Sequence, residues 1–384
     1  MNRAKPVLFT PGPLEVPRVV SEYMADPPAN YHRQDAFRTM FADNQQDLKD
    51  LIGIRTPGDW HVTMFASTGT GANDVCLLAL SRLGRGLIVS NGYFGERLVT
   101  QATECGVEHE VLRLPVEEPM DPRLVEDALA ADPGVTWVFF VSHETRAGLV
   151  NPLVEVGRTC KRHGLMVAAD CVSSAYAYPI DLEAAQVDLA SASSSKAIMA
   201  HPGLGMVFTR TTAVERLRAA GRPRGSSLDL VAEFDKQSKL REPRFGQPVA
   251  LHAALRAACL HLKSIGIDAH HRRIRRQMQD LAAHLGELGA PARVDPSYRS
   301  WVVCNFDLPP GFTCTEISKY MEGQGLFLLY GIGGDKNHFQ IATMGNLSDE
   351  NMSALKRAFT RLFTGRRRMV SDLARPAAVA STGR

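Results

Sequence analysis

Short apolar segments alternate with amphipathic segments between about residues 60 and 210. Several of the apolar segments are apolar on both faces, as strands covered by helices on either side must be. The expected strands are Val62–Ala66, Gly86–Asn91, Thr136–Ser142, Leu165–Asp170, Asp188–Ser193 and Gly205–Thr209. The expected helices between them are Ala72–Leu83, Gly95–Glu104, Pro122–Ala131 and Leu153–His163. This alternation predicts βα units around a largely parallel sheet.

The pattern changes after Arg210, where helices follow one another before a second strand-rich region begins. The expected elements are helices Ala213–Ala220, Pro248–Ile265 and Asp268–Leu288, strand Trp301–Phe306, helix Thr315–Gln324, strands Leu326–Tyr330 and His338–Met344, and helix Asp349–Phe363. We therefore expect an N-terminal arm at 1–20, a large domain at 21–265 and a smaller α+β domain at 266–365. The tail 366–384 is rich in Ala, Ser, Gly, Pro and Arg, a composition that predicts disorder.

The composition is that of an ordinary globular chain, with 384 residues, 45% hydrophobic and 22% charged. The chain has 44 Lys and Arg residues against 41 Asp and Glu residues. Because this net charge is small, we expect neither nucleic acid nor a membrane as a partner. The seven cysteines contain no C-x-x-C pair, which favours reduced thiols and no metal site. No segment approaches the roughly 18 apolar residues of a membrane span, so we expect a cytoplasmic protein.

Two short segments at the ends of predicted strands could bind a phosphorylated heterocycle. In the first, Ser67–Asn73, small residues let backbone N–H groups approach a phosphate, and the Thr68 and Thr70 hydroxyls add hydrogen bonds. In the second, Asp170 ends an apolar strand, where it could keep a pyridine nitrogen protonated and so make the ring an electron sink. Taken alone, the first segment is more often an ordinary βα turn. For Asp170 taken alone, a helix N-cap or a solvated strand end is an equally good explanation.

Two further segments could hold a carbonyl group and a planar ring. Lys196 follows an apolar strand and three serines, away from any amphipathic helix, and desolvation there would favour the neutral amine that imine formation requires. Phe94 lies between Gly92 and Gly95, which let the main chain bring one ring flat over a planar cofactor. A surface lysine and a core aromatic at a turn are the alternatives for these two residues.

Taken in order, the motifs resemble those of the class V aminotransferases. The matching segments are TPGPLEVP, YHRQDAF, STGTGAND, VSNGYFGER, SHETRAGLVNP, AADCVSS, SSSKAIMAHPGLG and FQIATMGNL, which run from about Phe9 to Phe363. The resemblance implies the aspartate-aminotransferase-like fold (fold type I), an α/β fold with a mainly parallel seven-stranded sheet in a large domain and a smaller α+β C-terminal domain. It also implies pyridoxal 5'-phosphate (PLP) as cofactor and a homodimer with active sites at the interface. The motifs are most similar to the 2-aminoethylphosphonate:pyruvate and alanine–glyoxylate branches.

The resemblance also assigns roles to residues of this chain. Lys196 would be the Schiff-base lysine and proton shuttle, and Asp170 the partner of the pyridine nitrogen. The remaining cofactor contacts would come from Thr68, Gly69 and Thr70 at the phosphate, Phe94 on the ring, Thr145 near the phenolic oxygen, and Ser193. Gly12, in the loop Thr10–Pro13, would line the substrate side.

Three departures from the family pattern concern the substrate and the phosphate. Gln340 stands where relatives usually have an arginine that binds the substrate's anionic group. Arg146 stands where small hydroxyl residues are common, and we hypothesise that it takes over anion recognition; the alternative is that it faces solvent or a carboxylate at the dimer interface. Gly246 replaces a threonine that relatives offer to the neighbouring subunit's phosphate, a contact that Gln247 could make instead.

The leading functional hypothesis is an aminotransferase that uses a small primary amine or amino acid, similar to 2-aminoethylphosphonate or alanine, and an oxo-acid or aldehyde. The main alternative is a PLP-dependent lyase, because an enzyme without an oxo-acid half-reaction need not retain the C-terminal arginine. A non-catalytic PLP-binding homologue is the third hypothesis, and the presence of lysine, acid, ring and phosphate turn argues against it.

Overall fold

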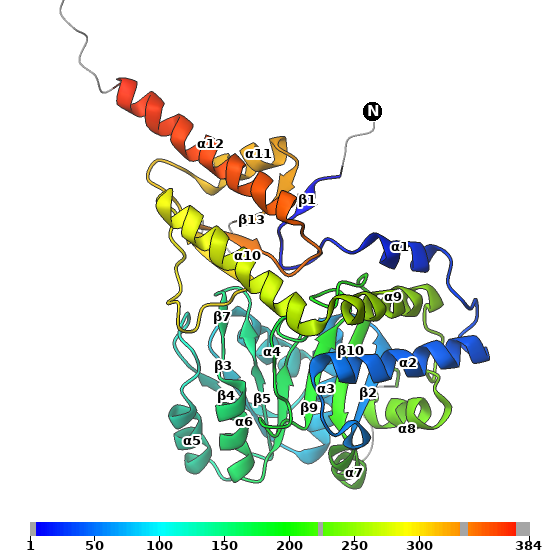
Figure 1. Ribbon diagram of the computed structural model, residues 1–384. Coiled ribbons are helices and arrows are strands. Elements are labelled where there is room, and N and C mark those ends of the chain that lie inside the picture. The colour runs from blue at the N-terminus through cyan, green and yellow to red at the C-terminus, as the bar shows by residue number, and fades with distance from the viewer. Residues whose placement is uncertain (1–4, 222–225, 331–336, 374–384) are drawn as a thin grey trace, which may run out of the picture.

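A seven-stranded sheet forms the centre of the computed structural model, which describes residues 5–221, 226–330 and 337–373 (Figure 1). Its strands, in spatial order, are β2 (Trp60–Ala66), β10 (Leu204–Arg210), β9 (Leu189–Ser193), β8 (Met166–Asp170), β5 (Trp137–Val141), β3 (Gly86–Ser90) and β4 (His109–Arg113). The strands from β9 to β4 are parallel, whereas β10 runs antiparallel to both of its neighbours. The expectation of a mainly parallel seven-stranded sheet is confirmed.

Apolar side chains cover both faces of this sheet, which explains why its strands read as continuous hydrophobic runs. In β5, Val138 and Phe140 belong to one buried cluster, while Trp137, Phe139 and Val141 belong to another. The helices of the sheet region are α1 (Arg18–Ala25), α2 (Asp35–Ile52), α3 (Gly69–Leu80), α4 (Tyr93–Glu104), α5 (Pro122–Ala131), α6 (Leu153–Arg162), α7 (Thr211–Ala219), α8 (Leu230–Leu240) and α9 (Val249–Ile265).

The hydrophobic pattern did not reveal four of these elements, namely β4, α1, α2 and α8. Strand β4 is an edge strand whose side chains are only partly covered, so it lacks the apolar run of its neighbours. In α2, the buried face includes polar residues: the Asn44 side chain donates to the carbonyl of His252 at 3.0 Å, and that of Gln45 donates to Val62 at 2.8 Å. Polar residues at buried positions interrupt the stripe by which an amphipathic helix is recognised.

A second, smaller sheet lies next to the C-terminal helices, at the top of Figure 1. Its elements are β11 (Val303–Asp307), β14 (His338–Ala342) and β13 (Leu329–Tyr330), with α10 (Ile267–Glu287), α11 (Cys314–Gly323) and α12 (Asp349–Leu373). The N-terminal strand β1 (Val7–Leu8) joins this region by pairing in parallel with β12 (Leu326–Phe327). Stacked phenylalanines form part of its core, with ring centroids 5.6 Å apart for Phe306 and Phe339.

One expectation for the C-terminus requires correction. The tail 366–384 was expected to be disordered, but α12 continues to Leu373, so the first part of the tail is helical. Residues 374–384 lie outside the described residues. The helix extends because the segment after Phe363 contains arginines and leucine, which favour helix, and its first proline comes only at position 376.

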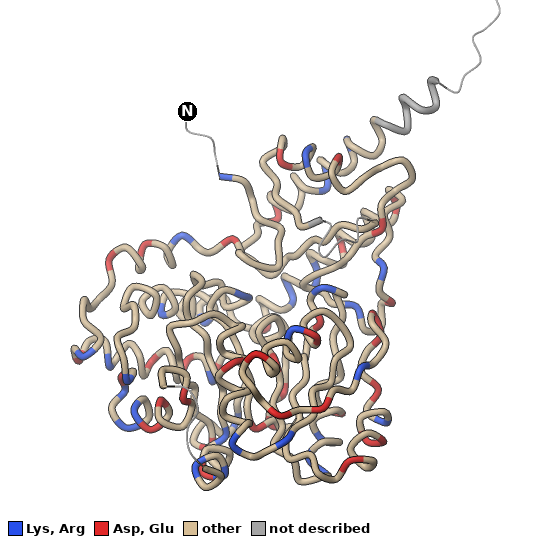
Figure 2. Tube along the Cα trace, turned by 180° about the vertical axis from the view of Figure 1, so that it is seen from behind, with Lys and Arg blue, Asp and Glu red and all other residues tan. Residues whose placement is uncertain are grey.

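Charged residues of both signs intermingle along the backbone trace (Figure 2). None of the helices in the described part of the chain is both long and apolar enough to cross a lipid bilayer. The seven cysteines are thiols rather than disulfides, and six of them are buried.

The glycine at the start of β3 provides a test of packing between neighbouring strands. A Cβ atom on Gly86 would lie 2.0 Å from ring atoms of Trp137, which is fully buried. We expect Gly86→Ala to lower the free energy of unfolding by ~1–3 kcal/mol, the usual cost of overpacking a core. The matched control is Gly58→Ala, because no atom lies within 4 Å of the added Cβ. Equal thermal midpoints for the two variants would contradict this packing.

Candidate active site

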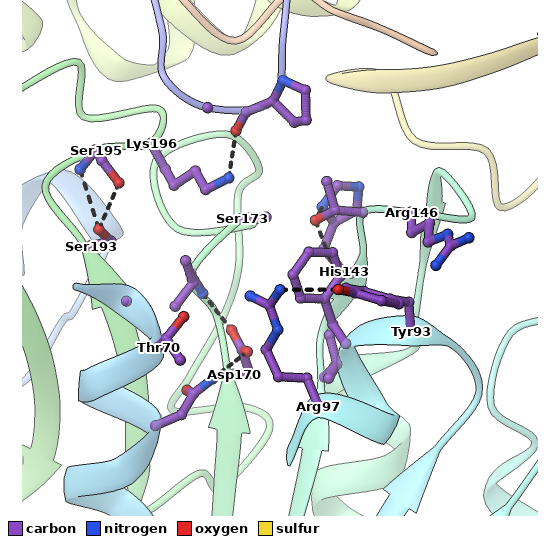
Figure 3. A pocket seen from close by; sticks show the side chains of 18 of the residues that line it. Thr70, Tyr93, Arg97, His143, Arg146, Asp170, Ser173, Ser193, Ser195 and Lys196 are labelled. Carbon is purple, nitrogen blue, oxygen red and sulfur yellow. Dashed lines mark hydrogen bonds between the residues drawn. The ribbon is translucent and has the colours of Figure 1, made fainter. Parts of the chain in front are cut away.

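A cavity of about 420 Å³ lies where the carboxyl ends of β8 and β9 meet the N-termini of α3 and α4 (Figure 3). We call it the main cavity. It is lined by eleven of the residues that sequence reasoning selected: Gly12, Thr68, Gly69, Thr70, Phe94, Thr145, Arg146, Asp170, Ser193, Lys196 and Gln340. Gln247 does not line this cavity.

Lys196 reaches the main cavity from the turn that follows β9. Its Nζ donates a hydrogen bond to the carbonyl of Pro11, and a Cβ on Gly12 would lie 3.0 Å from that nitrogen. The loop therefore needs glycine at position 12, both for space and because its φ is +149°. Burial, opposed by the charge of Asp170 and assisted by that of Arg97, lowers the pKa of Lys196 to about 8.

Asp170 ends β8 and points into the main cavity from below, as Figure 3 shows. Its carboxylate accepts hydrogen bonds from the Asn73 side chain at 2.8 Å and the backbone N–H of Val172 at 2.9 Å. Burial raises the pKa of this carboxyl above its usual range, and the two hydrogen bonds and the charge of Lys196 act against that shift. A protonated heterocyclic nitrogen would favour the ionised form further.

Asn73 is a site residue that the sequence reasoning missed. Its side-chain oxygen accepts a hydrogen bond from Ser191 at 2.5 Å while its nitrogen donates to Asp170. Asn73 thus connects β9 to the end of β8 and fixes the orientation of the carboxylate. Asn73 follows Gly69 by four residues, which places both on the same face of one helix. This spacing was the sequence signal that could have identified Asn73 as a site residue.

The N-terminus of α3 forms an anion-binding turn. The Thr68 hydroxyl caps the helix by accepting from the N–H of Gly71 at 3.2 Å. A Cβ on Gly69 would approach a methyl carbon of Val172 to 2.7 Å, so only glycine lets the backbone lie this close to the strand ends. The unpaired N–H groups and the positive end of the helix dipole favour a phosphate here.

The residues that line the main cavity fit PLP. The main cavity combines an anion-binding helix end, a buried carboxylate for a pyridine nitrogen, an amine of lowered pKa for an aldehyde, and an aromatic side chain, Phe94. Glycine at position 69 lets the start of α3 lie against the strand ends, because a Cβ there would collide with Val172 and Ser193.

Glu144 is a second residue that the sequence reasoning passed over. One carboxylate oxygen accepts from the backbone N–H of Phe94 at 2.9 Å, and the other from that of Arg146 at 3.3 Å. Burial raises the pKa of Glu144 to about 7, against the effect of these backbone hydrogen bonds. Glu144 therefore joins the start of α4 to the loop that carries Thr145 and Arg146, and it positions both Phe94 and Arg146.

Gln340 and Gln247 make contacts within this chain. The Gln340 amide nitrogen donates to the carbonyls of Thr145 at 2.9 Å and Arg146 at 3.3 Å, so its donors hold that loop. The Gln247 amide nitrogen donates to the carbonyl of Met64 at 3.1 Å. The Thr145 hydroxyl lies 3.3 Å from Nδ1 of His143, whose pKa burial lowers to about 3, so this imidazole is neutral.

The lowered pKa of Lys196 predicts a measurable titration. In the cofactor-free protein, the neutral fraction of the amine should rise as the pH increases through about 8, more than two units below an ordinary lysine. Reaction with trinitrobenzenesulfonate, read by peptide mass spectrometry at residue 196, should therefore show a midpoint near pH 8. The exposed Lys239 in the same sample is the internal standard for the extent of the reaction. A midpoint for Lys196 near 10.4, the ordinary value for a lysine, would contradict the desolvated site.

Comparison with known proteins agrees with this site. The model of the aminotransferase class V family matches residues 10–334. The chain is 28% identical over 359 residues to a 2-aminoethylphosphonate–pyruvate transaminase of Syntrophobacter fumaroxidans, covering 92% of this chain and 95% of that protein. It is 30% identical over 366 residues to the enzyme of that name from Paraburkholderia phymatum, covering 93% and 97%.

A solved structure supports the same assignment at the level of the fold. The alanine–glyoxylate aminotransferase of Nostoc sp. superposes with a TM-score of 0.85 at 24% sequence identity, covering 94% of this chain and 96% of that chain. The family match, the relatives and the shared architecture lead to one conclusion: this chain belongs to the class V aminotransferases, PLP-dependent transaminases of fold type I.

Proposed function

We propose that this aminotransferase transfers the amino group of a small primary amine that carries an anionic group, similar to 2-aminoethylphosphonate or alanine, to an oxo-acid such as pyruvate. The observation that carries the proposal is the meeting of Lys196, Asp170 and the α3 N-terminus in one cavity that also contains two arginines, Arg97 and Arg146. The relatives named 2-aminoethylphosphonate–pyruvate transaminase support the same substrate class.

Each part of the cofactor has a proposed holder in this chain. Thr68, Gly69 and Thr70 would bind the phosphate, Phe94 would lie against the ring, and Asp170 would pair with the ring nitrogen. When bound, PLP supplies an electron sink that acidifies the C–H bond beside the substrate nitrogen. Ser193 would act on the cofactor site indirectly, through the turn that carries Lys196, because its hydroxyl lies 2.9 Å from that of the neighbouring Ser195.

Lys196 is the proposed attachment point and proton carrier. A pKa of about 8 means that a substantial fraction of the amine is neutral near physiological pH, as both covalent attachment and proton abstraction require. The hydrogen bond to the Pro11 carbonyl directs Nζ toward the Thr10–Pro13 loop, where the substrate would enter. Lys196 can thus take the proton from the substrate carbon and hold it at Nζ for delivery on the same face.

Arg146 is the proposed partner of the substrate's anionic group. It lines the main cavity, and its backbone carbonyl accepts a hydrogen bond from Asn305 at 2.6 Å. Gln340 could offer the substrate only its amide oxygen, because its nitrogen already donates to backbone carbonyls. An anion would therefore gain its charge-assisted hydrogen bonds from arginine rather than from Gln340.

The test is a panel of amines applied to the PLP-loaded protein, including 2-aminoethylphosphonate, alanine and serine. Transamination predicts that an amine donor bleaches the visible cofactor band, that pyruvate restores it, and that Lys196→Ala has no such band. Release of ammonia with the band retained would instead identify a lyase. If no amine in the panel changes the spectrum, the proposed function is wrong.

We further propose a homodimer in the cytoplasm. Support for self-association comes from exposed apolar side chains on two helices that pack against each other: Tyr23 and Met24 on α1, and Leu260 and Ile265 on α9. Exposed apolar side chains on two adjoining helices are typical of an interaction surface. The proposal gives Gln247 a role at the neighbouring subunit's phosphate. The seven thiols favour a reducing compartment.

Light scattering after size-exclusion chromatography tests the dimer. We expect twice the chain mass of 42.0 kDa for the wild type and a shift toward the monomer for Leu260→Asp, because a charge would be buried in the interface. Leu124→Asp is the matched control, since Leu124 is equally exposed, at 43% against 41%, but lies on α5. A monomeric wild type, or the same behaviour of both variants, would refute the proposed surface.

A further inference from the structure

Two arginines of the main cavity lie against the same aromatic ring. The guanidinium carbon of Arg146 is 4.7 Å from the ring centroid of Tyr93, and that of Arg97 is 5.2 Å from it. Arg97 also donates a hydrogen bond to the Tyr93 hydroxyl at 3.3 Å. Figure 3 shows the three side chains together at one side of the cavity, with Tyr93 next to both arginines.

Arg97 has no acidic partner among the residues that the structure describes. Its contacts are Tyr93 and the ring of Phe94, whose centroid lies 4.9 Å from the guanidinium carbon. Both rings belong to the same helix, α4, and lie four and three residues before Arg97. Apart from the hydrogen bond to Tyr93, the Arg97 guanidinium donates to no residue in the described part of the chain, and the two aromatic contacts leave its other N–H groups for a ligand.

The charge balance of the main cavity favours a ligand with more than one negative charge. Among the described residues, its lining contains the cations Lys196, Arg97 and Arg146, and one carboxylate, that of Asp170. Asp170 is the proposed partner of the cofactor's ring nitrogen, and the α3 N-terminus is the proposed site of its phosphate. The two arginines are therefore in excess of what the cofactor requires.

The backbone of Arg146 is fixed by three side chains. Its N–H donates to Glu144 at 3.3 Å, and its carbonyl accepts from Asn305 at 2.6 Å and from Gln340 at 3.3 Å. Gln340 is the residue that stands where relatives usually have the anion-binding arginine. The amide of Gln340 supports the loop that carries Arg146. Glutamine at position 340 thus lacks the charge of an arginine but helps to position the charge of Arg146.

We propose that Arg97 and Arg146, aligned by Tyr93, bind the substrate's distal anionic group together, and that this group is a phosphonate or phosphate rather than a carboxylate. This inference rests on the proposed function, because it assigns the anionic end of that substrate. A tetrahedral dianion has three oxygens and can accept from two guanidinium groups, whereas one bidentate arginine satisfies a carboxylate. Gln340 and Tyr93 are positioning residues in this arrangement.

The experiment measures binding of ethylphosphonate, which has no amine and cannot react, to the PLP-loaded protein by calorimetry. Arg97→Gln and Arg146→Gln should each raise its Kd by about 10–100-fold, as expected for loss of a charge-assisted hydrogen bond. In the double variant, the Kd should rise by less than the product of the two single-variant factors, because both arginines bind one ligand. Propionate should bind the wild type more weakly than ethylphosphonate.

Two further variants separate positioning from general damage. Tyr93→Phe should retain most of the affinity, while Tyr93→Leu should weaken ethylphosphonate binding by about 2–5-fold, the effect of a lost cation–π contact. The matched control is Arg113→Gln: Arg113 lines an adjoining cavity but pairs with Glu96 at 3.1 Å, so ethylphosphonate affinity should not change. If Arg97→Gln loses the cofactor, Arg97→Lys carries the test, because it keeps the charge but not the planar fork.

The outcomes distinguish this inference from the proposed function. Ethylphosphonate affinity that is unchanged in Arg97→Gln, or no better than propionate affinity in the wild type, overturns the arginine pair even if amines are transaminated. Absence of transamination with every amine would overturn the proposed function, yet ethylphosphonate binding would still report on the two arginines. Failure of the wild type to bind ethylphosphonate at all also overturns the inference.

Discussion

The burial of one amine beside one carboxylate is the constraint on which the rest of this structure depends. Lys196 and Asp170 line the same cavity because the adjacent parallel strands β8 and β9 end at one edge of the sheet, with Asp170 paired in register with Ser191. Desolvation disfavours the charge of both groups, lowering the pKa of the lysine and raising that of the aspartate. Hydrogen bonds from Asn73 and the N–H of Val172 oppose the effect of burial on Asp170.

Supporting hydrogen bonds make this arrangement rigid. Asn73 connects Asp170 to Ser191, and Glu144 joins the N–H of Phe94 to that of Arg146. A site built in this way fixes its reacting groups before the ligand arrives, which reduces the ordering that binding requires. Gln340 belongs to the same network, because its amide supports the loop that carries Arg146.

Much of the fold could be predicted because the strands of the parallel sheet are buried on both faces and therefore appear as apolar runs. β4 could not, since none of its side chains is fully buried and Glu110 and Arg113 interrupt its apolar residues. α2 could not, since Asn44 and Gln45 are buried through hydrogen bonds to distant backbone groups. The helical continuation to Leu373 was also missed, because composition alone does not fix where a helix ends.

The sequence by itself determined the order of the motifs, and with it the family, the cofactor and the candidate residues Lys196, Asp170, Phe94 and the Thr68–Thr70 turn. It did so because each group follows a strand or opens a helix, a relation that is local along the chain. Only the tertiary structure decided which side chains face one another. The pairing of Arg97 with Arg146 over Tyr93 joins residues about fifty positions apart, and no local pattern encodes a contact that depends on the packing of α4 against a distant loop.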